Sequence, residues 1–196
     1  DTLNRSMPDY RFVPVYYIGS EDADLDELNH IRLNGEKLTW NTKQKGAVGR
    51  MKLDKQVTAL INQMEGQLGI LPFGKEIINL IRESYQEGTS LQEATFRFVH
   101  ALFSEFGLLV LLPDNANLKR TMIPVFREEL LQQPAAAIIE KSAAALNAAD
   151  YKVQASAREI NLFYLKEDIR NRIERKGEQY QVVDTNLRFS QEEMLA

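Results

Sequence analysis

Cysteine is absent from the sequence, so disulfide bonds, thiolate-bound metals and a cysteine nucleophile are excluded. No apolar run approaches the roughly 20 residues that a membrane-spanning helix requires, and no basic segment followed by an apolar core indicates a signal peptide. Histidine occurs only twice and tryptophan once. The lack of cysteine is typical of a reducing compartment. We therefore expect a cytoplasmic protein that makes no contact with a membrane.

An excess of positive charge is also lacking. The formal net charge is -4, so the attraction that draws proteins to a nucleic-acid backbone is missing, and we expect no nucleic-acid partner. Hydrophobic residues make up 44% and charged residues 27% of the 196 residues. This composition is that of a globular chain long enough to bury a core.

Two apolar runs predict neighbouring parallel strands of one sheet. The first, RFVPVYYIG (11–19), is rich in β-forming residues and predicts a strand buried on both faces. The second, LLVLL (108–112), follows a helix that begins with a capping box at Ser90 and Glu93 and ends before Gly107. The order of strand, insertion, helix, strand and helix is that of a βαβ unit interrupted after its first strand.

The sequence between the two strands predicts an insertion. Asn34-Gly35 is the strongest short signal for a hairpin, because both turn residues need positive φ. Residues 53–68 keep apolar positions at helical spacing, and a second helix follows Pro72. We therefore expect an insertion made of one hairpin and two helices.

The C-terminal part predicts a different arrangement. An alanine-rich helix (135–149) precedes two alternating runs, YKVQA (151–155) and INLFYL (160–165), and a turn at Lys176-Gly177. These signals indicate a small antiparallel sheet. The expected fold class is thus α/β, in three parts: a partial Rossmann-like core (1–30 and 89–133), a connecting insertion of a hairpin plus helices (31–88), and a helix with an antiparallel β appendage (134–196).

The stretch GSEDADLDELNH (19–30) gathers five carboxylates beside one of the two histidines: Glu21, Asp22, Asp24, Asp26, Glu27 and His30. A calcium loop is excluded, because its sixth position is Glu27 instead of glycine and its twelfth is Leu33 instead of glutamate. His100, the other histidine, lies on a different predicted helix, and we predict no metal site. Carboxylates in a first helical turn also meet the positive end of the helix dipole, so a helix start is the plain structural interpretation.

The position of this stretch favours a functional interpretation. It follows the carboxyl end of a predicted parallel strand, where open α/β sheets bind ligands. Asp114 and Asn115 follow the second strand, so both loops are expected to face one cleft. Asn117 can cap a further helix that Pro124 breaks. Lys119 and Arg120 lie at the start of that helix and form a candidate anion site, with a solvated helix face as the alternative.

Three segments resemble the cysteine-adding enzymes of bacillithiol biosynthesis. VPVYYIGSEDADLDELNHI matches their distinctive acidic segment, and TSLQEATFRFVHALFSEFGLLVLLPDNANLKRTMIPVFREEL (89–130) matches a second region. Tyr151-Lys-Val-Gln-Ala, followed by NLFYL and the Gly177 hairpin, is a third match. The matches cover most of the chain in the family's order. Ala23 departs from the family, since many members carry histidine there.

The resemblance implies a Rossmann-like core akin to class I nucleotidyl-transferase folds, with connecting-peptide insertions. It also implies a ligase that joins cysteine to glucosaminyl malate, with ATP as the suspected activator. The resemblance implies that the residues at the matching positions of the family's site are Glu21, Asp22, Asp24, Glu27, Asn29 and His30. We expect Asp22, Asp24 and His30 to act in catalysis, and Glu21, Glu27, Asn29, Asp114 and Asn115 to bind substrate.

The family's glycine-rich N-terminal portion, later core strands and C-terminal coiled coil, through which it is expected to oligomerise, are not present in this chain. We therefore expect an internal fragment that is inactive by itself. Two other functions stay open. One is an unrelated nucleotide-binding α/β enzyme, which would need a glycine-rich phosphate loop. The other is a non-enzymatic helical interaction module, favoured if the acidic stretch points away from every cleft.

Overall fold

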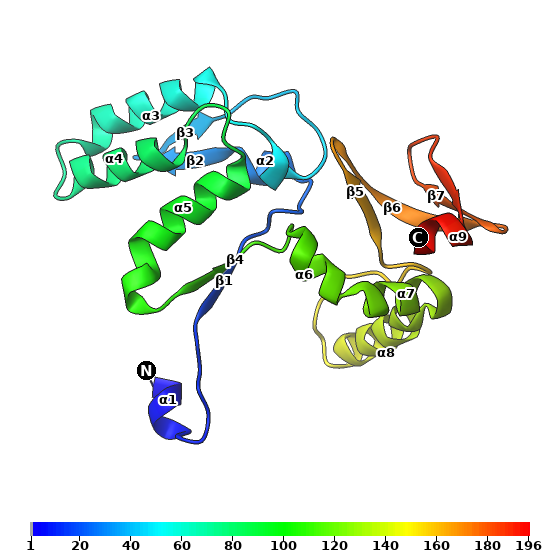
Figure 1. Cartoon of the computed structure of the whole chain (residues 1–196). Coiled ribbons are helices and arrows are strands. Elements are labelled where there is room, and N and C mark those ends of the chain that lie inside the picture. Colours follow the sequence, from blue (N-terminus) through cyan, green and yellow to red (C-terminus); the bar gives the residue numbers. More distant parts are fainter. Residues whose placement is uncertain (1) are drawn as a thin grey trace. The chain divides into compact units, whose positions relative to one another are not determined.

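The computed structural model describes residues 2–196 and divides the chain into two compact units, Asp1–Asn115 and Ala116–Ala196. The three-part domain division expected from sequence stays a prediction. No helix of the described residues has both the length and the apolar character that crossing a membrane requires. The first unit (Figure 1) contains α1 (Thr2–Ser6), β1 (Val15–Tyr17), α2 (Leu25–Leu28), β2 (His30–Leu33), β3 (Glu36–Thr39), the 3₁₀ turn η1 (Val48–Arg50), α3 (Lys55–Leu68), α4 (Gly74–Ser84), α5 (Leu91–Phe103), the 3₁₀ turn η2 (Ser104–Phe106) and β4 (Leu109–Leu111).

The strands β1 and β4 form a parallel pair, in which Val15 lies opposite Leu109 and Tyr17 opposite Leu111. The predicted parallel pairing is confirmed. The predicted burial of the first strand is wrong: Val15 is 54% exposed and Tyr17 61%. The physical reason is that each strand has only one hydrogen-bonded neighbour among the described residues, so packing does not cover both faces of the pair.

The hairpin of β2 and β3 is antiparallel, and its turn has the conformation that the sequence predicts. Asn34 has φ +48° and Gly35 φ +85°, as a type I′ turn requires. The hairpin leads into Trp40, which is 4% exposed and packs in a core cluster with Val48 and Leu53. This core fixes the hairpin against the helices that follow.

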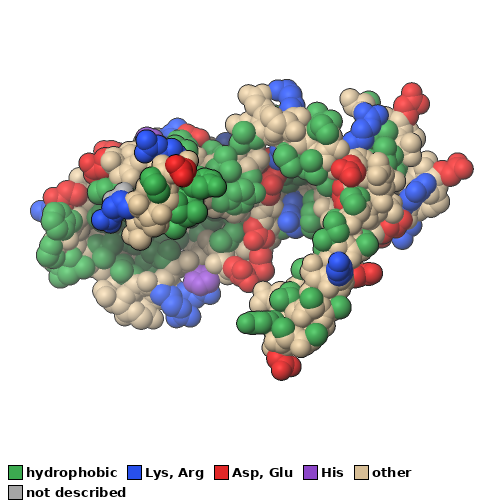
Figure 2. Space-filling view, turned by 90° about the horizontal axis from the view of Figure 1, so that it is seen from below, with side chains coloured by type: hydrophobic (Ala, Val, Ile, Leu, Met, Phe, Trp, Pro, Cys, Tyr) green, Lys and Arg blue, Asp and Glu red, His purple; other side chains and the backbone are tan. Residues whose placement is uncertain are grey.

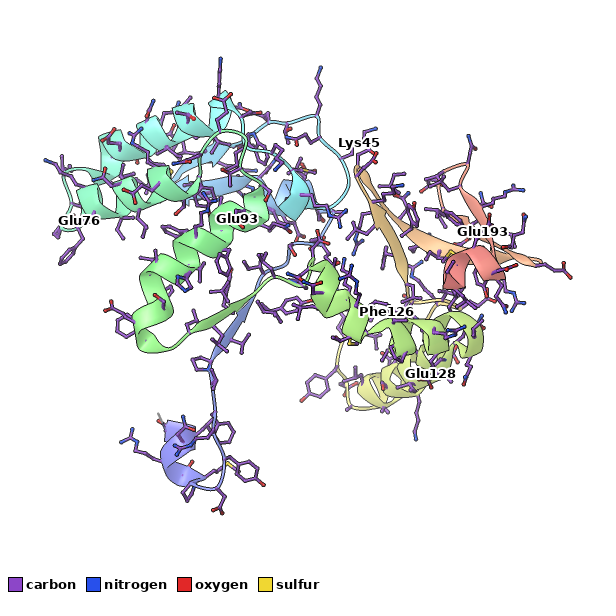
Figure 3. All side chains as sticks on the ribbon, viewed as in Figure 1. Lys45, Glu76, Glu93, Phe126, Glu128 and Glu193 are labelled. Carbon is purple, nitrogen blue, oxygen red and sulfur yellow. The ribbon has the colours of Figure 1, made fainter. Side chains whose placement is uncertain are left out.

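The helices α3 and α5 begin at capping residues. Asp54 accepts a hydrogen bond from the backbone N–H of Gln56 at 3.0 Å and another from Trp40 Nε1 at 3.1 Å. Ser90 accepts from the backbone N–H of Glu93 at 3.4 Å, and Figure 3 labels Glu93 on α5. Asp54 therefore both caps α3 and anchors the buried indole of the core.

The second unit contains α6 (Ala116–Thr121), α7 (Ile123–Gln132), α8 (Pro134–Ala148), β5 (Phe163–Lys166), β6 (Ile169–Lys176), β7 (Gln179–Val182), β8 (Arg188–Ser190) and α9 (Gln191–Leu195). The predicted break at Pro124 is confirmed, because Pro124 lies in the first turn of α7. Asn117 lies inside α6 and does not precede it as a cap would. The helix begins at Ala116, two residues before the start that a cap at Asn117 predicts.

The four strands β5 to β8 form one antiparallel sheet, as the alternation predicts. YKVQA (151–155) is not a strand, because its backbone pairs with no neighbour. Glu129 on α7 is 7% exposed and accepts from the backbone N–H groups of Asn161 at 2.9 Å and Ala135 at 3.2 Å. This carboxylate ties the segment before β5 to α7 and to the start of α8.

Candidate functional site

The loop that follows β1 is held by backbone hydrogen bonds on two sides. Ile18 N–H donates to the carbonyl of Leu111 on β4 at 3.0 Å. From η1, Gly49 N–H donates to the carbonyl of Ser20 at 3.0 Å and Val48 N–H to that of Asp22 at 2.7 Å. The acidic residues are therefore carried on a backbone whose position is set by η1 and by the neighbouring strand.

Most carboxylates of this loop face water. Asp22, Asp24, Asp26 and Glu27 are exposed, and Glu21 is half-buried. Asp22 Oδ1 accepts from the backbone N–H of Asp24 at 3.1 Å, which forms a local turn. Asp24 makes no side-chain capping bond to α2, a helix of only four residues. Asp26 and Glu27 do lie in the first turn of α2, as the interpretation of this stretch as a helix start predicts. Within residues 2–196, no three histidine, aspartate or glutamate side chains are grouped closely enough to hold a metal ion.

Asp114, in the loop after β4, forms a bidentate ion pair with Arg50, the last residue of η1. Arg50 Nε donates to Oδ2 at 2.5 Å and Nη2 to Oδ1 at 2.7 Å, and the Asp114 side chain is 5% exposed. The hydrogen bond to Asp114 raises the pKa of Arg50 against the opposing effect of burial, and Glu21 adds attraction. Arg50 therefore links the loops that leave β1 and β4. Sequence reasoning missed it, because no motif surrounds it.

Three further residues of the predicted site follow Asp114 along the chain. Asn115 is exposed, and its backbone N–H donates to the carbonyl of Pro113 at 2.8 Å. Lys119 and Arg120 belong to α6 in the second unit, where Arg120 Nη1 donates to Asn117 Oδ1 at 2.6 Å. The anion site at Lys119 and Arg120 stays a prediction.

A cavity of about 420 Å³ opens in the first unit. Its walls come from the end of β1, the hairpin, η1 and the helices α3, α4 and α5, and Figure 2 shows hydrophobic side chains gathered in the hollowed part of this unit. Of the residues expected to share one cleft, Asn29 and His30 line the cavity. The lining does not include Asp22, Asp24 or Asp114. The cleft expected to be shared by Asp22, Asp24, His30 and the loop of Asp114 and Asn115 stays a prediction.

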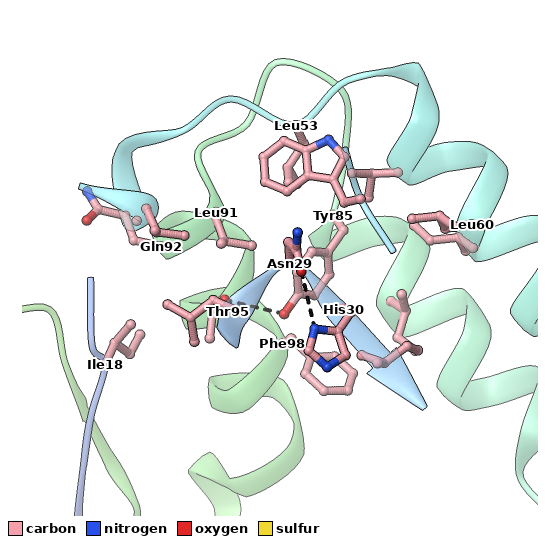
Figure 4. Close-up of a pocket in the computed structure, with 18 of the residues that line it drawn as sticks. Ile18, Asn29, His30, Leu53, Leu60, Tyr85, Leu91, Gln92, Thr95 and Phe98 are labelled. Atoms are coloured by element: carbon pink, nitrogen blue, oxygen red, sulfur yellow. Dashed lines mark hydrogen bonds between the residues drawn. The ribbon is translucent and has the colours of Figure 1, made fainter. Parts of the chain in front are cut away.

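His30 lines this cavity and contacts the neighbouring residue Asn29. Its Nδ1 lies 3.2 Å from Asn29 Oδ1 (Figure 4). An amide oxygen only accepts hydrogen bonds, so this contact requires the hydrogen on Nδ1. In the tautomer that carries its hydrogen on Nδ1, Nε2 is left as a hydrogen-bond acceptor.

Tyr85 gives the cavity wall a titratable group. Its hydroxyl lies 3.3 Å from Thr95 Oγ1 (Figure 4), and burial raises its pKa above the usual value of 10.0, although the contact with Thr95 opposes this. A raised pKa means that the folded chain favours the neutral phenol more than the unfolded chain does. The stability that Tyr85 contributes is therefore complete below pH 10 and is lost as the pH rises through the folded-state pKa.

We accordingly expect Tyr85→Phe to flatten the alkaline part of the stability profile. Urea unfolding of the parent chain should show falling stability as the pH rises above about 10, and the variant should lose much of that fall. Tyr17→Phe is the matched control, because Tyr17 is 61% exposed. An identical alkaline loss in the parent and in Tyr85→Phe would contradict the assignment.

The comparison with known families gives one match over the whole chain. The family described as "Bacillithiol biosynthesis BshC, N-terminal Rossmann-like domain" matches residues 1–196. Proteins named "Putative cysteine ligase BshC" are similar to the chain. The one from Flavobacterium psychrophilum is 39% identical over 193 residues, which are 98% of this chain and 36% of that protein. The one from Cytophaga hutchinsonii is 37% identical over 97% of this chain and 34% of that protein.

The chain therefore spans about a third of the length of these relatives. The family match and the parallel pair of β1 and β4 agree on a Rossmann-like fold, which the sequence predicts. The loops of the candidate site leave that pair at its carboxyl end. On the match over its full length, this chain belongs to the BshC family and corresponds to the family's N-terminal Rossmann-like domain.

Proposed function

We propose that the chain forms part of a ligase that adds cysteine to glucosaminyl malate in bacillithiol biosynthesis. The family match over residues 1–196 is the observation that carries this proposal. The similar proteins, which are named as putative cysteine ligases, support this proposal, and so does the acidic loop at the carboxyl end of the parallel pair. The family match also removes the unrelated nucleotide-binding enzyme from the alternatives.

Joining cysteine to an amine is a condensation that forms an amide bond. The amine must lose a proton before it attacks, and the carboxylate of cysteine must be activated. ATP is the proposed source of that activation. The sequence contains no glycine-rich phosphate loop. Lys119 and Arg120, on α6 of the second unit, stay proposed as an anion site.

The residues of the first unit suit the handling of an amine. Asp22 and Asp24 are exposed on a loop held by η1, where they can accept hydrogen bonds from the ammonium of cysteine or of the amino sugar. His30 offers Nε2 as the proton acceptor, with its tautomer set by Asn29. Arg50 forms an ion pair with Asp114. This pairing keeps the Asp114 carboxylate from competing for the same ammonium group.

A non-enzymatic interaction module is the second candidate. The position of Asp22 and Asp24 outside the cavity lining favours it, because exposed acids also suit a protein partner. Only the ligase proposal predicts that Asp22 and Asp24 affect the rate of turnover.

A chimaera separates the two candidates. The chain would replace the matching third of the Flavobacterium psychrophilum protein, and product formation from cysteine, ATP and glucosaminyl malate would be followed by mass spectrometry. We expect turnover comparable with that of the unmodified relative, and none from the 196-residue chain alone. A folded chimaera that forms no product, beside an active parent, would contradict the ligase proposal.

A further inference from the structure

The cavity of the first unit has walls that disfavour charge. Its lining, taken from residues 16–98, contains no aspartate, glutamate, lysine or arginine. A charged group that enters it would lose hydration without meeting a carboxylate, ammonium or guanidinium counter-charge, which is unfavourable. Phosphates, carboxylates and ammonium groups are therefore poor occupants.

The size and shape of the walls favour a flat apolar occupant. A cavity of about 150 Å³ is enough to hold benzene, and this one has about 420 Å³. Aromatic side chains contribute to its lining from four different elements: Tyr16 on β1, Trp40 after β3, Tyr85 at the end of α4 and Phe98 on α5. Such faces stack on flat rings.

Two oxygens in the wall have no hydrogen-bond partner. Ser20 is 1% exposed, and neither its Oγ nor Gln92 Oε1 contacts a donor or acceptor among the described residues. Both residues line the cavity, from the loop after β1 and from α5. A buried polar atom left unpaired is destabilising, and most such atoms in folded proteins are paired. Two of them in one wall point to a missing donor.

His30 Nε2 adds a third acceptor at the same cavity, because Nδ1 is engaged with Asn29. We propose that the cavity binds an uncharged, flat and largely apolar molecule that carries N–H donors. Both wall oxygens are closed to solvent, so the occupant reaches them by shifting the side chains that cover them. The lining shares Asn29 and His30 with the residues proposed for the ligase reaction, but it includes none of the carboxylates of the acidic loop.

The single tryptophan of the chain makes the proposal testable without a known ligand. Trp40 lines the cavity, and its Nε1–H gives the only tryptophan indole signal in a ¹H–¹⁵N spectrum of the chain. Three probes of one shape differ only in the group tested: 1-naphthamide has N–H donors, methyl 1-naphthoate has none, and 1-naphthoate carries a charge. We expect saturable shifts with the amide, affinity about tenfold lower for the ester, and no shift with the carboxylate.

Variants test the two wall oxygens. Gln92→Leu and Ser20→Ala remove an unpaired oxygen each, so the melting temperature should stay equal or rise while affinity for 1-naphthamide falls to that of the ester. A residue that contacts the ligand should lose affinity without a fall in melting temperature. A residue that only supports the wall should lose both affinity and stability. A fall in both quantities would overturn the role of that residue.

Other outcomes would overturn the proposal as a whole. They are an unmoved Trp40 signal, equal binding of amide and ester, and binding of the carboxylate as tight as that of the amide. A chimaera that fails to bind 1-naphthamide by calorimetry, while the chain alone binds it, would show that another part of the longer protein fills the cavity.

Discussion

Asp22→Asn is expected to lower kcat/KM of the chimaera by roughly tenfold to a hundredfold and to leave its melting temperature nearly unchanged. In the parent chain, Asp22 Oδ1 accepts a hydrogen bond from Asp24 N–H at 3.1 Å, and the side-chain oxygen of asparagine can accept the same bond. The hydrogen bond from Val48 N–H to the backbone carbonyl of residue 22 is unaffected. The shape of the loop therefore stays, and only the charge is lost. A charge-assisted hydrogen bond contributes about 1.5–3 kcal/mol, and about 1.4 kcal/mol corresponds to a factor of ten.

The matched control is Asp26→Asn. Asp26 is also exposed, carries the same charge and lies in the same acidic stretch, but it is not among the residues that the family's site carries over. Its loss should leave kcat/KM close to the parent value. Turnover that survives Asp22→Asn together with a lowered melting temperature would reduce this stretch to a local structural role.

Gly49→Ala should lower the melting temperature of the chain by roughly 2–12 °C. A Cβ at Gly49 would lie 2.5 Å from the carbonyl oxygen of Ser20 and 2.7 Å from its Cα, and backbone atoms have no rotamer by which to move aside. Overpacking of this kind costs about 1–3 kcal/mol, and each kcal/mol corresponds to about 2–4 °C in a chain of this length. The hydrogen bond between Gly49 N–H and Ser20, at 3.0 Å, must also lengthen.

Gly66→Ala provides the control, because the same atom is added where space is open. Gly66 lies in α3, and no heavy atom is within 4 Å of the position that a Cβ would take there. Alanine favours the helix by up to about 1 kcal/mol over glycine, so this variant should be as stable as the parent or more stable. Thermal and urea unfolding measure both variants. Equal stability of Gly49→Ala and the parent would mean that η1 and the loop after β1 separate easily.

Local signals in the sequence were sufficient for much of the fold. Asn34-Gly35 determines its turn because few residues adopt positive φ, and Gly107 ends η2 at φ +78° for the same reason. Pro124 has no N–H to donate and so begins α7. Each of these residues acts within one turn of the chain, which is why a single sequence reveals it.

Features that depend on distant partners could not be predicted in this way. Arg50 and Asp114 are 64 positions apart, and neither lies in a pattern that selects the other. Nothing in the local sequence around Ser20 and Gln92 indicates that packing buries their side-chain oxygens without a hydrogen-bond partner. The exposure of Val15 was mispredicted because composition indicates a tendency to form a strand, whereas burial depends on what covers it.

The parallel register of β1 and β4 has a consequence for the order of folding. Val15 pairs with Leu109, and the hairpin and the helices α3, α4 and α5 all lie in the long segment between them. Closing so long a loop is entropically costly until its interior is compact. The three paired positions are too few to offset that cost alone. The strand pair, and with it the meeting of Arg50 and Asp114, should therefore form after the hairpin and the helical insertion and open before them, which would make the acidic loop a reporter of the earliest steps of unfolding.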